Sequence, residues 1–486
     1  MKSRLRVWLV RLALVAVTIV VTVIVGGGFD ARRRHPELKP WHRLVPSEPT
    51  AAELTDTATL ADYLRREAAV FDQVHREVEL PLAEIDRTAA NRFNAQGMSS
   101  PSRLPRDYNR TFELVPSTVR GGALLVHGLT DSPYSMRALA ERLTSAGFYT
   151  LSLRMPGHGG VPGGLTRATW EDWMAAVRLG ARHVRGRIGP GLPLLMVGYS
   201  NGGALTVKYA LDLLDGRADP RPNRLVLLSP MIGVTPFARL SSVVSALAPI
   251  PYFDRAAWLD VLPEYNPFKF NSFPANAARQ TYDLTTAIAA QLEGHRGDGR
   301  LSGLPPILTF QSLVDATVST EAVVHTLYSA LPRNGSELVI FDLNRSAHLD
   351  PFVQPSDRAL IATLFDRHAS RDYTLTVLSN VSNQTLDLAE WQVTAGTTTI
   401  ETRPLGLAWP ADVFSLSHIA MPFPPDDPVY GVAAVRVPSG PIRLGMLAPR
   451  GERSVLTVPI DTLMRVSYNP FFTYLSDRTV AWAVAP

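Results

Sequence analysis

The residues best suited to chemistry are a serine enclosed by glycines, in the pentapeptide Gly198-Tyr199-Ser200-Asn201-Gly202. An apolar run over 194–197 precedes the serine, and a stretch of helical character over 203–214 follows it. Glycines at these positions permit the strained strand-to-helix turn that exposes a serine hydroxyl. The spacing predicts a nucleophile elbow, in which Ser200 attacks a carbonyl carbon and forms an acyl-enzyme. The alternative is a tight glycine-rich turn with an incidental serine. The chain has no cysteine that could serve as the nucleophile instead.

Short apolar runs alternate with helical stretches between about residues 111 and 365, and each run is a candidate strand. The candidates are 123–126, 149–153, 193–197, 225–228, 307–310 and 338–341. Fully apolar strands separated by helices predict a parallel sheet covered on both faces. The predicted fold class is therefore α/β, with a doubly wound, mostly parallel sheet. The stretch 229–306 is too long for a plain crossover and predicts a cap, whose aromatic residues either line an acyl pocket or pack within the cap.

Four motifs carry a resemblance to a known family. They are Val126-His127-Gly128, the loop Arg154-Met155-Pro156-Gly157-His158-Gly159, the pair Trp170 and Trp173 around Asp172, and the serine pentapeptide. Over residues 120–350 the chain resembles the α/β-hydrolase family, within it the branch of monoglyceride lipases, carboxylesterases and serine aminopeptidases. The blocks 264–275 and 413–431 are similar to those of bacterial membrane-associated hydrolases. The resemblance implies an α/β-hydrolase fold with a cap insertion, and serine-dependent hydrolysis.

The serine requires a histidine base and a carboxylate that orients it. Asp315 follows the candidate strand 307–310, and its place fits the family order Ser…Asp…His. Two histidines compete for the base: His348, in the usual place after the strand 337–341, and His418, at the end of an alternating run in a proline-rich block. We favour His418, because the rigid block suits a catalytic loop.

The family also implies an oxyanion hole. Its donors would be the backbone N–H groups of Leu129, in the loop after the first parallel strand, and of Asn201, directly after the serine. The supporting residues are His127, with a structural role, and the glycines Gly128, Gly198 and Gly202. No cofactor and no metal are expected, since the sequence holds neither an H-E-x-x-H pair nor a G-x-x-x-x-G-K-[ST] loop.

The basic character of the chain is confined to its N-terminus. Residues 1–40 hold eight of the 48 basic residues and two of the 44 acidic ones, which leaves 40 bases against 42 acids elsewhere. This distribution argues against a nucleic-acid partner. Residues 12–29 carry no charge and are dominated by Val, Leu, Ile and Ala, enough for one membrane span of roughly 20 residues. A cleaved signal peptide that ends at the glycines 26–28 is the alternative.

The predicted organisation has seven parts. They are a basic N-terminus (1–6), a transmembrane anchor (7–29), a linker and helical arm (30–110), the first part of a hydrolase core (111–230), the cap (231–304), the second part of the core (305–369) and a β-rich C-terminal extension (370–486). The extension is either a small domain or an antiparallel continuation of the main sheet. If His418 is the base, the extension completes the active site.

The sequence as a whole predicts a membrane-anchored serine hydrolase whose catalytic domain is exported to the periplasm or outside the cytoplasm. Its substrate would be a small-molecule or lipid ester, such as a monoacylglycerol-like compound. The alternatives are a peptidase or an acyltransferase on the same fold, and an inactive, membrane-anchored binding or scaffold protein.

Overall fold

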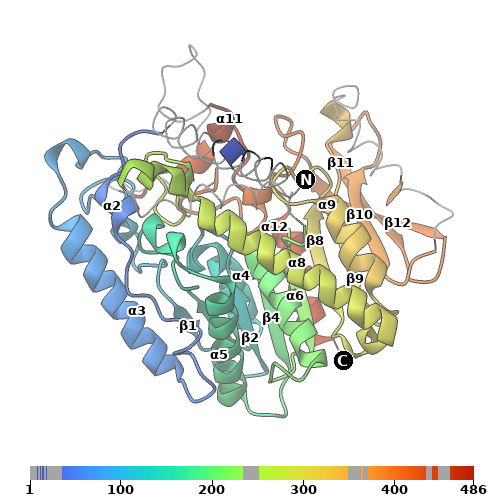
Figure 1. Cartoon of the computed structure of the whole chain (residues 1–486). Helices are drawn as coiled ribbons and strands as arrows, with labels where there is room; N and C mark the ends of the chain where they lie inside the picture. Colours follow the sequence, from blue (N-terminus) through green and yellow to red (C-terminus); the bar gives the residue numbers. More distant parts are fainter. Residues whose placement is uncertain are drawn as a thin grey trace.

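The main sheet, of ten strands, runs through the molecule (Figure 1). The computed structural model describes residues 35–233, 251–347, 370–433, 440–446 and 460–485, together with a few single residues in 8–18 and 363–364. In spatial order the strands are β1 (Phe112–Leu114), β3 (Phe148–Leu153), β2 (Gly121–Val126), β4 (Leu194–Tyr199), β5 (Arg224–Leu228), β8 (Ile307–Ser312), β9 (Glu337–Phe341), β10 (Thr374–Asn380), β11 (Asp387–Val393) and β12 (Ile400–Ala408).

The strands from β3 to β10 are mutually parallel, and only the edge strands β1, β11 and β12 pair antiparallel. Every residue of β2, β3, β4 and β8 is buried, as expected for parallel strands with both faces covered. The prediction of a mostly parallel α/β fold is confirmed, and all six candidate strands are present.

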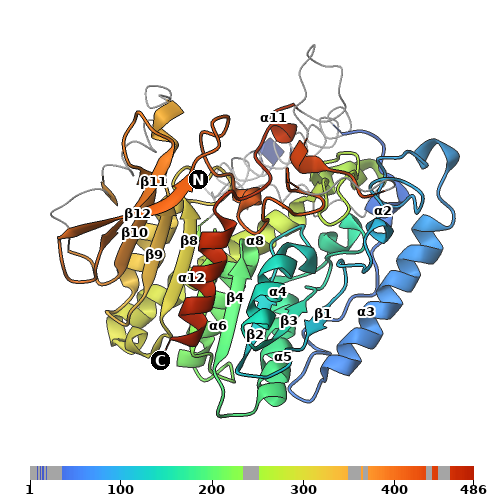
Figure 2. The same ribbon diagram turned by 180° about the vertical axis from the view of Figure 1, so that it is seen from behind.

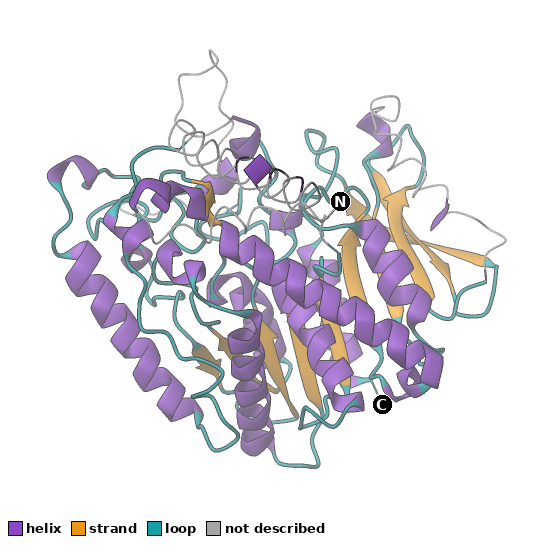
Figure 3. Cartoon of the chain, in the orientation of Figure 1, coloured by secondary structure: helices purple, strands orange, loops and turns teal. Residues whose placement is uncertain are grey.

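Helices cover both faces of this sheet. The helices α5 (Trp170–Ile188), α6 (Asn201–Leu214) and α8 (Ala275–Asp298) lie over the face seen in Figure 1, whereas α4 (Arg137–Ser145) and α12 (Phe472–Val484) lie over the face seen in Figure 2. Each face has its own cluster of buried apolar side chains. The sheet therefore forms the middle layer of three, with its strands between the helices in Figure 3.

The predicted helical arm contains one long helix. Thr50 and Glu53 form a local hydrogen-bonded pair, but only turns follow them. The long helix α3 (Leu60–Val74) begins after Thr59, whose hydroxyl accepts the N–H of Asp62. A π-helical turn over His75–Glu79 extends it and ends before Pro81, which has no N–H to continue a helix.

The C-terminal extension continues the main sheet. Strand β10 pairs in parallel with β9, and β11 and β12 follow antiparallel. The prediction of a β-rich extension is confirmed for these strands. The alternating run that ends at His418 is not a strand, because residues 413–417 form a loop and His418 begins a short 3₁₀ helix. The sequence did not predict α12. Residues 434–439 and 447–459 of the extension lie outside the described residues. The loop replaces a strand because side chains of the core bond its carbonyl groups, as shown below.

The proposed anchor over 7–29 lies almost wholly outside the described residues. Among the helices that the structure does describe, none combines the length and the apolar character needed to cross a bilayer.

Candidate active site

Ser200 occupies the turn between β4 and α6 with φ 55° and ψ −117°, a backbone conformation that favours glycine. Its N–H donates to Leu228 O at 2.9 Å, so the turn is fixed to the end of β5. The two glycines of the pentapeptide are required by close approach. A Cβ on Gly198 would lie 2.3 Å from Gly202 O, and one on Gly202 would lie 2.1 Å from Val126 O. The predicted strand–turn–helix elbow is thus present.

The structure brings Ser200, His418 and Asp315 into one hydrogen-bonded series. Ser200 Oγ lies 3.0 Å from His418 Nε2, and His418 Nδ1 lies 2.8 Å from Asp315 Oδ2. Ser200 is 4% exposed and His418 is 3% exposed. Because the carboxylate can only accept, Nδ1 carries the proton and Nε2 is free to accept the serine proton. This is the arrangement that general-base activation of a serine requires.

Asp315 is held in its ionised form. Its Oδ1 accepts the backbone N–H groups of Thr317 at 2.8 Å and Val318 at 3.0 Å. Burial by itself would raise the pKa of this carboxyl group. The charge interaction and hydrogen bond with His418, with the two backbone hydrogen bonds, outweigh burial and lower the pKa of Asp315 below its usual value. The carboxylate therefore stays charged and can stabilise an imidazolium.

His348, the other candidate base, lies outside the described residues. The loop after β9, which leads toward it, contacts the segment that carries His418. The N–H of Asn344 donates to Phe414 O at 2.8 Å, and Asn344 Nδ2 donates to Val413 O at 3.0 Å. After β9 the chain adds β10, β11 and β12 to the sheet and then returns to the site beside Asn344.

Three further side chains fix the segment around His418. Ser312, the last residue of β8, donates its hydroxyl to Leu416 O at 2.7 Å, and Ser417 donates to Val466 O. The Tyr199 hydroxyl donates to His418 O at 3.3 Å, and its ring stacks on the imidazole with centroids 5.4 Å apart. Sequence reasoning missed these residues. The one sequence signal for this role was Ser312, a serine at the end of the apolar strand β8.

The loop after β2 lies against the serine. A Cβ on Gly128 would lie 3.1 Å from Ser200 Cβ, so glycine permits the close approach. His127 fixes this loop: its Nδ1 donates to Gly128 O at 2.9 Å, while its Nε2 accepts the N–H of Met155 at 3.0 Å. Burial lowers the pKa of His127 to about 4, so the ring is neutral and suited to this structural role.

The predicted oxyanion donors are the backbone N–H groups of Leu129, which follows Gly128 in the loop against the serine, and of Asn201, which directly follows Ser200. Within the described ranges neither donates to an acceptor of the protein. Both are therefore available to a developing oxyanion, the role that the family resemblance implies.

The helical arm reaches the site through a buried ion cluster. Arg154, in the loop after β3, is completely buried and pairs with Glu67 of α3 at 3.1 Å and with Glu48 of the linker at 2.8 Å. It also donates to His158 O at 2.8 Å. The imidazole rings of His158 and His127 lie 5.0 Å apart, edge to face. The helical arm, in which the sequence predicts no catalytic residue, thus supports the loops behind the serine.

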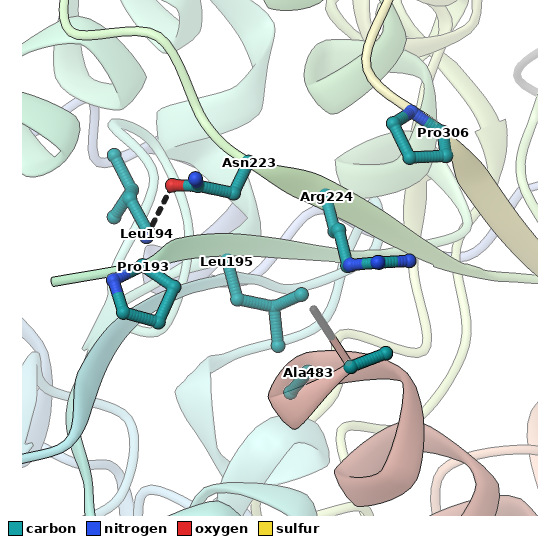
Figure 4. A pocket seen from close by; sticks show the side chains of 8 residues that line it. Pro193, Leu194, Leu195, Asn223, Arg224, Pro306 and Ala483 are labelled. Atoms are coloured by element: carbon teal, nitrogen blue, oxygen red, sulfur yellow. Dashed lines mark hydrogen bonds between the residues drawn. The ribbon is translucent and has the colours of Figure 1, made fainter. Parts of the chain in front are cut away.

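A separate cavity lies at the other end of the parallel strands, where β4 and β5 begin. It has a volume of about 270 Å³ and is lined by Pro193, Leu194, Leu195, Asn223, Arg224, Pro306, Ala483 and Ala485. Figure 4 shows Asn223 turned toward Leu194, whose N–H it accepts at 2.8 Å. These residues lie where β4 and β5 begin, whereas Ser200 follows the end of β4, so the cavity is separate from the triad. No cluster of three or more metal-ligating side chains occurs among the described residues.

Fold and site together place the chain among the serine hydrolases of the α/β type, in which an elbow serine at the carboxyl edge of a parallel sheet is paired with a histidine and a buried carboxylate. Residues 117–380, more than half of the chain, match the family model of serine aminopeptidases, S33. The chain belongs to this family. The matched range includes Ser200 and Asp315 and ends before His418.

Individual relatives match smaller parts. A thermostable monoacylglycerol lipase of Bacillus sp. (strain H-257) is 39% identical over 89 residues, 18% of this chain and 34% of the lipase, so the chain matches about a third of that relative. Among solved structures, one from work on the metagenome-derived lipolytic enzymes LipS and LipT is 24% identical, with a TM-score of 0.38, over 54% of this chain and 97% of its own. The monoacylglycerol lipase of Paleococcus ferrophilus is 18% identical, with a TM-score of 0.36, over 48% and 89%.

Proposed function

We propose that the chain is an esterase that cleaves carboxylic esters with a lipophilic acyl group, such as monoacylglycerols, through an acyl-enzyme on Ser200. The hydrogen-bonded series of Ser200, His418 and Asp315 carries this proposal. Membership of the serine aminopeptidase S33 family and the stretch of sequence shared with a monoacylglycerol lipase support it.

The proposed reaction has two halves, acylation of Ser200 and hydrolysis of the acyl-enzyme, and the same catalytic groups act in both. His418 Nε2 takes the proton of Ser200 Oγ as the oxygen attacks the ester carbonyl, and Asp315 stabilises the imidazolium. The N–H groups of Leu129 and Asn201 bind the negatively charged oxygen of the tetrahedral intermediate. His418 then donates its proton to the departing alkoxide. In the second half, His418 Nε2 takes a proton from a water molecule as its oxygen attacks the acyl carbon. His418 then returns the proton to Ser200 Oγ, and the carboxylic acid leaves.

The described cap aromatics pack within the protein. Phe268 stacks on Tyr134 with ring centroids 4.0 Å apart, and Trp258 contacts His42 edge to face at 4.9 Å. Both aromatic side chains are buried, as is Phe270. Their shared role is to fix the cap, so the lipophilic acyl group is proposed from the relatives and not from these side chains.

Labelling with a fluorophosphonate, combined with hydrolysis of a short-chain ester, tests the proposal. The wild type is expected to label and turn over, and Ser200→Ala to do neither. His418→Ala and His348→Ala form a matched pair: only the first is expected to lose turnover, by about 10³-fold or more. A folded wild type that neither labels nor hydrolyses any ester would refute the esterase, and full activity of His418→Ala would remove this histidine from the mechanism.

The remaining alternatives give different results in the same assay. A peptidase would cleave amides of free amino acids faster than matched esters, and an acyltransferase would transfer the acyl group to an added alcohol in preference to water. An inactive binding protein would not label at all.

We also propose that residues 7–29 anchor the catalytic domain at a membrane, on its exported side. The uncharged stretch 12–29 supports this. Full-length protein is expected in the membrane fraction and a chain starting at residue 35 in the soluble fraction. Recovery of both in the soluble fraction would contradict the anchor.

A further inference from the structure

Two cationic side chains border the active site without a part in the proposed reaction. One is Lys269, in the predicted cap, on a loop that a backbone hydrogen bond fixes to the loop after β2. The N–H of Phe270 donates to Thr130 O at 2.8 Å, and Thr130 directly follows Leu129 of the proposed oxyanion hole. Lys269 is half-buried, and it makes no hydrogen bond or ion pair with any residue that the structure describes.

The other cation is Arg465, in the exposed segment after α11 (Ile460–Leu463). Its guanidinium donates to Thr317 Oγ1 at 3.2 Å, and the N–H of Thr317 in turn binds Asp315. The next residue, Val466, accepts the hydroxyl of Ser417 beside His418. Arg465 is therefore fixed on the side of the site formed by the acid and the base.

Longer-range electrostatic interactions act between the two sides. Lys269 interacts with Arg465 and with Asp131, a buried carboxyl group two residues beyond Leu129. The charges of Asp131 and Arg465 also affect the pKa of the hydroxyl group of Tyr199, whose ring stacks on His418. Asp131 belongs to the oxyanion side and Arg465 to the acid side, so Lys269 interacts electrostatically with groups on both sides of the triad.

Two cationic side chains and one buried carboxyl group interact here. Burial lowers the pKa of Lys269, and Arg465 lowers it further, while Asp131 raises it. Burial raises the pKa of Asp131 to about 7, so this carboxyl group is partly protonated near neutral pH. The guanidinium group of Arg465 keeps its charge. An incoming anion would supply the hydrogen-bond partner that Lys269 does not have among the described residues.

We infer that the substrate ester carries an anionic group, a carboxylate or a phosphate, which Lys269 and Arg465 bind together. The inference rests on the proposed esterase function and specifies its substrate class. It also disfavours a peptidase, because the same two cations would repel the protonated α-amino group of a peptide.

Two pairs of esters test this inference and show on which side of the ester the anion lies. The first pair, 1-butyrylglycerol 3-phosphate and 1-butyrylglycerol, differs on the alcohol side. The second pair, monomethyl adipate and methyl hexanoate, differs on the acyl side. We expect the wild type to prefer the anionic member of at least one pair by tenfold or more in kcat/KM, and high salt to reduce that preference.

Variants assign the preference to the two cations. Lys269→Met and Arg465→Met are each expected to lower the ratio of anionic to neutral kcat/KM by roughly tenfold, mainly through KM, as for a lost hydrogen bond to a charged group. Arg279→Met is the control, since Arg279 is an exposed arginine on α8 that pairs with Asp283. Melting temperatures verify folding, and exposed Arg465 remains informative should Lys269→Met not fold.

Three results would overturn the inference. They are equal or faster turnover of the neutral member in both pairs, a preference that survives both substitutions, and an equal loss of preference in Arg279→Met. None of these three results would contradict the proposed esterase activity. Absence of turnover of all four esters, with no fluorophosphonate labelling, would instead refute the proposed function and this inference with it.

Discussion

Replacement of Ser312 by alanine tests whether core side chains position His418. The substitution deletes one oxygen atom, whose hydroxyl donates to Leu416 O at 2.7 Å, two residues before the histidine. Ser312 is 1% exposed, so water does not take its place and the carbonyl group is left unpaired. Loss of such a partner costs about 1–3 kcal/mol of unfolding free energy. If Leu416 shifts, the histidine moves with it.

The expected kinetic effect is a fall in kcat of roughly tenfold with little change in KM, since a misplaced base weakens proton transfer more than substrate binding. Ser336→Ala is a matched control. Ser336 is equally buried and accepts the N–H of Ile307 at 3.0 Å, at the other end of β8. It should lose similar stability and keep its kcat per folded molecule.

The assay combines urea unfolding, kcat and KM for a neutral ester, and the rate of fluorophosphonate labelling. Equal stability losses with an unchanged kcat in Ser312→Ala would refute the positioning argument. Equal losses of kcat in both variants would show a general effect of destabilisation.

Two further predictions concern buried charges. Glu67→Gln should lower the unfolding free energy by about 3 kcal/mol in urea titrations, because it leaves Arg154 with only one of its two carboxylate partners; a loss below about 1 kcal/mol would contradict the structural role of the arm. Asp131→Asn should gain thermal stability relative to the wild type as pH rises. The folded-state pKa of Asp131, about 7, lies above its ordinary value of 3.8, so its contribution to stability is complete below about pH 4 and is lost as pH rises through 7. A difference in melting temperature that stays constant from pH 4 to 8 would oppose this.

The serine and the acid were accessible from the sequence because local patterns define them. A G-x-S-x-G pentapeptide between an apolar strand and a helix determines its own geometry, and the structure shows that turn at Ser200. Asp315 follows β8 in the expected chain order and hydrogen-bonds to His418. Parallel strands present their carboxyl ends at one edge, so strand order alone predicts that groups following β4 and β8 meet.

The histidine could not be placed by local patterns alone. The run 413–418 alternates like a strand, yet 413–417 is a loop because Asn344 and Ser312 bond the carbonyl groups of Phe414 and Leu416. Those bonds connect residues that lie far apart in the sequence, and no periodicity encodes them. For the same reason the sequence did not reveal Lys269 as a neighbour of the site, since its position depends on the bond from Phe270 to Thr130.

The position of His418 beyond three additional strands makes the base depend on the C-terminal extension. Arg478 of α12 pairs with Glu337 of β9, and Tyr474 donates to Glu390 of β11 at 2.6 Å, so helix and added strands stabilise one another.

Local opening of the extension would therefore remove the histidine while the serine elbow, buried between β4, β5 and α6, remains folded. We expect fluorophosphonate labelling to fall at a lower urea concentration than the loss of far-ultraviolet circular dichroism, and Arg478→Met to widen this gap. Coincident transitions in the wild type and the variant would show that the extension and the core unfold as one cooperative unit, and that the base is no more labile than the nucleophile.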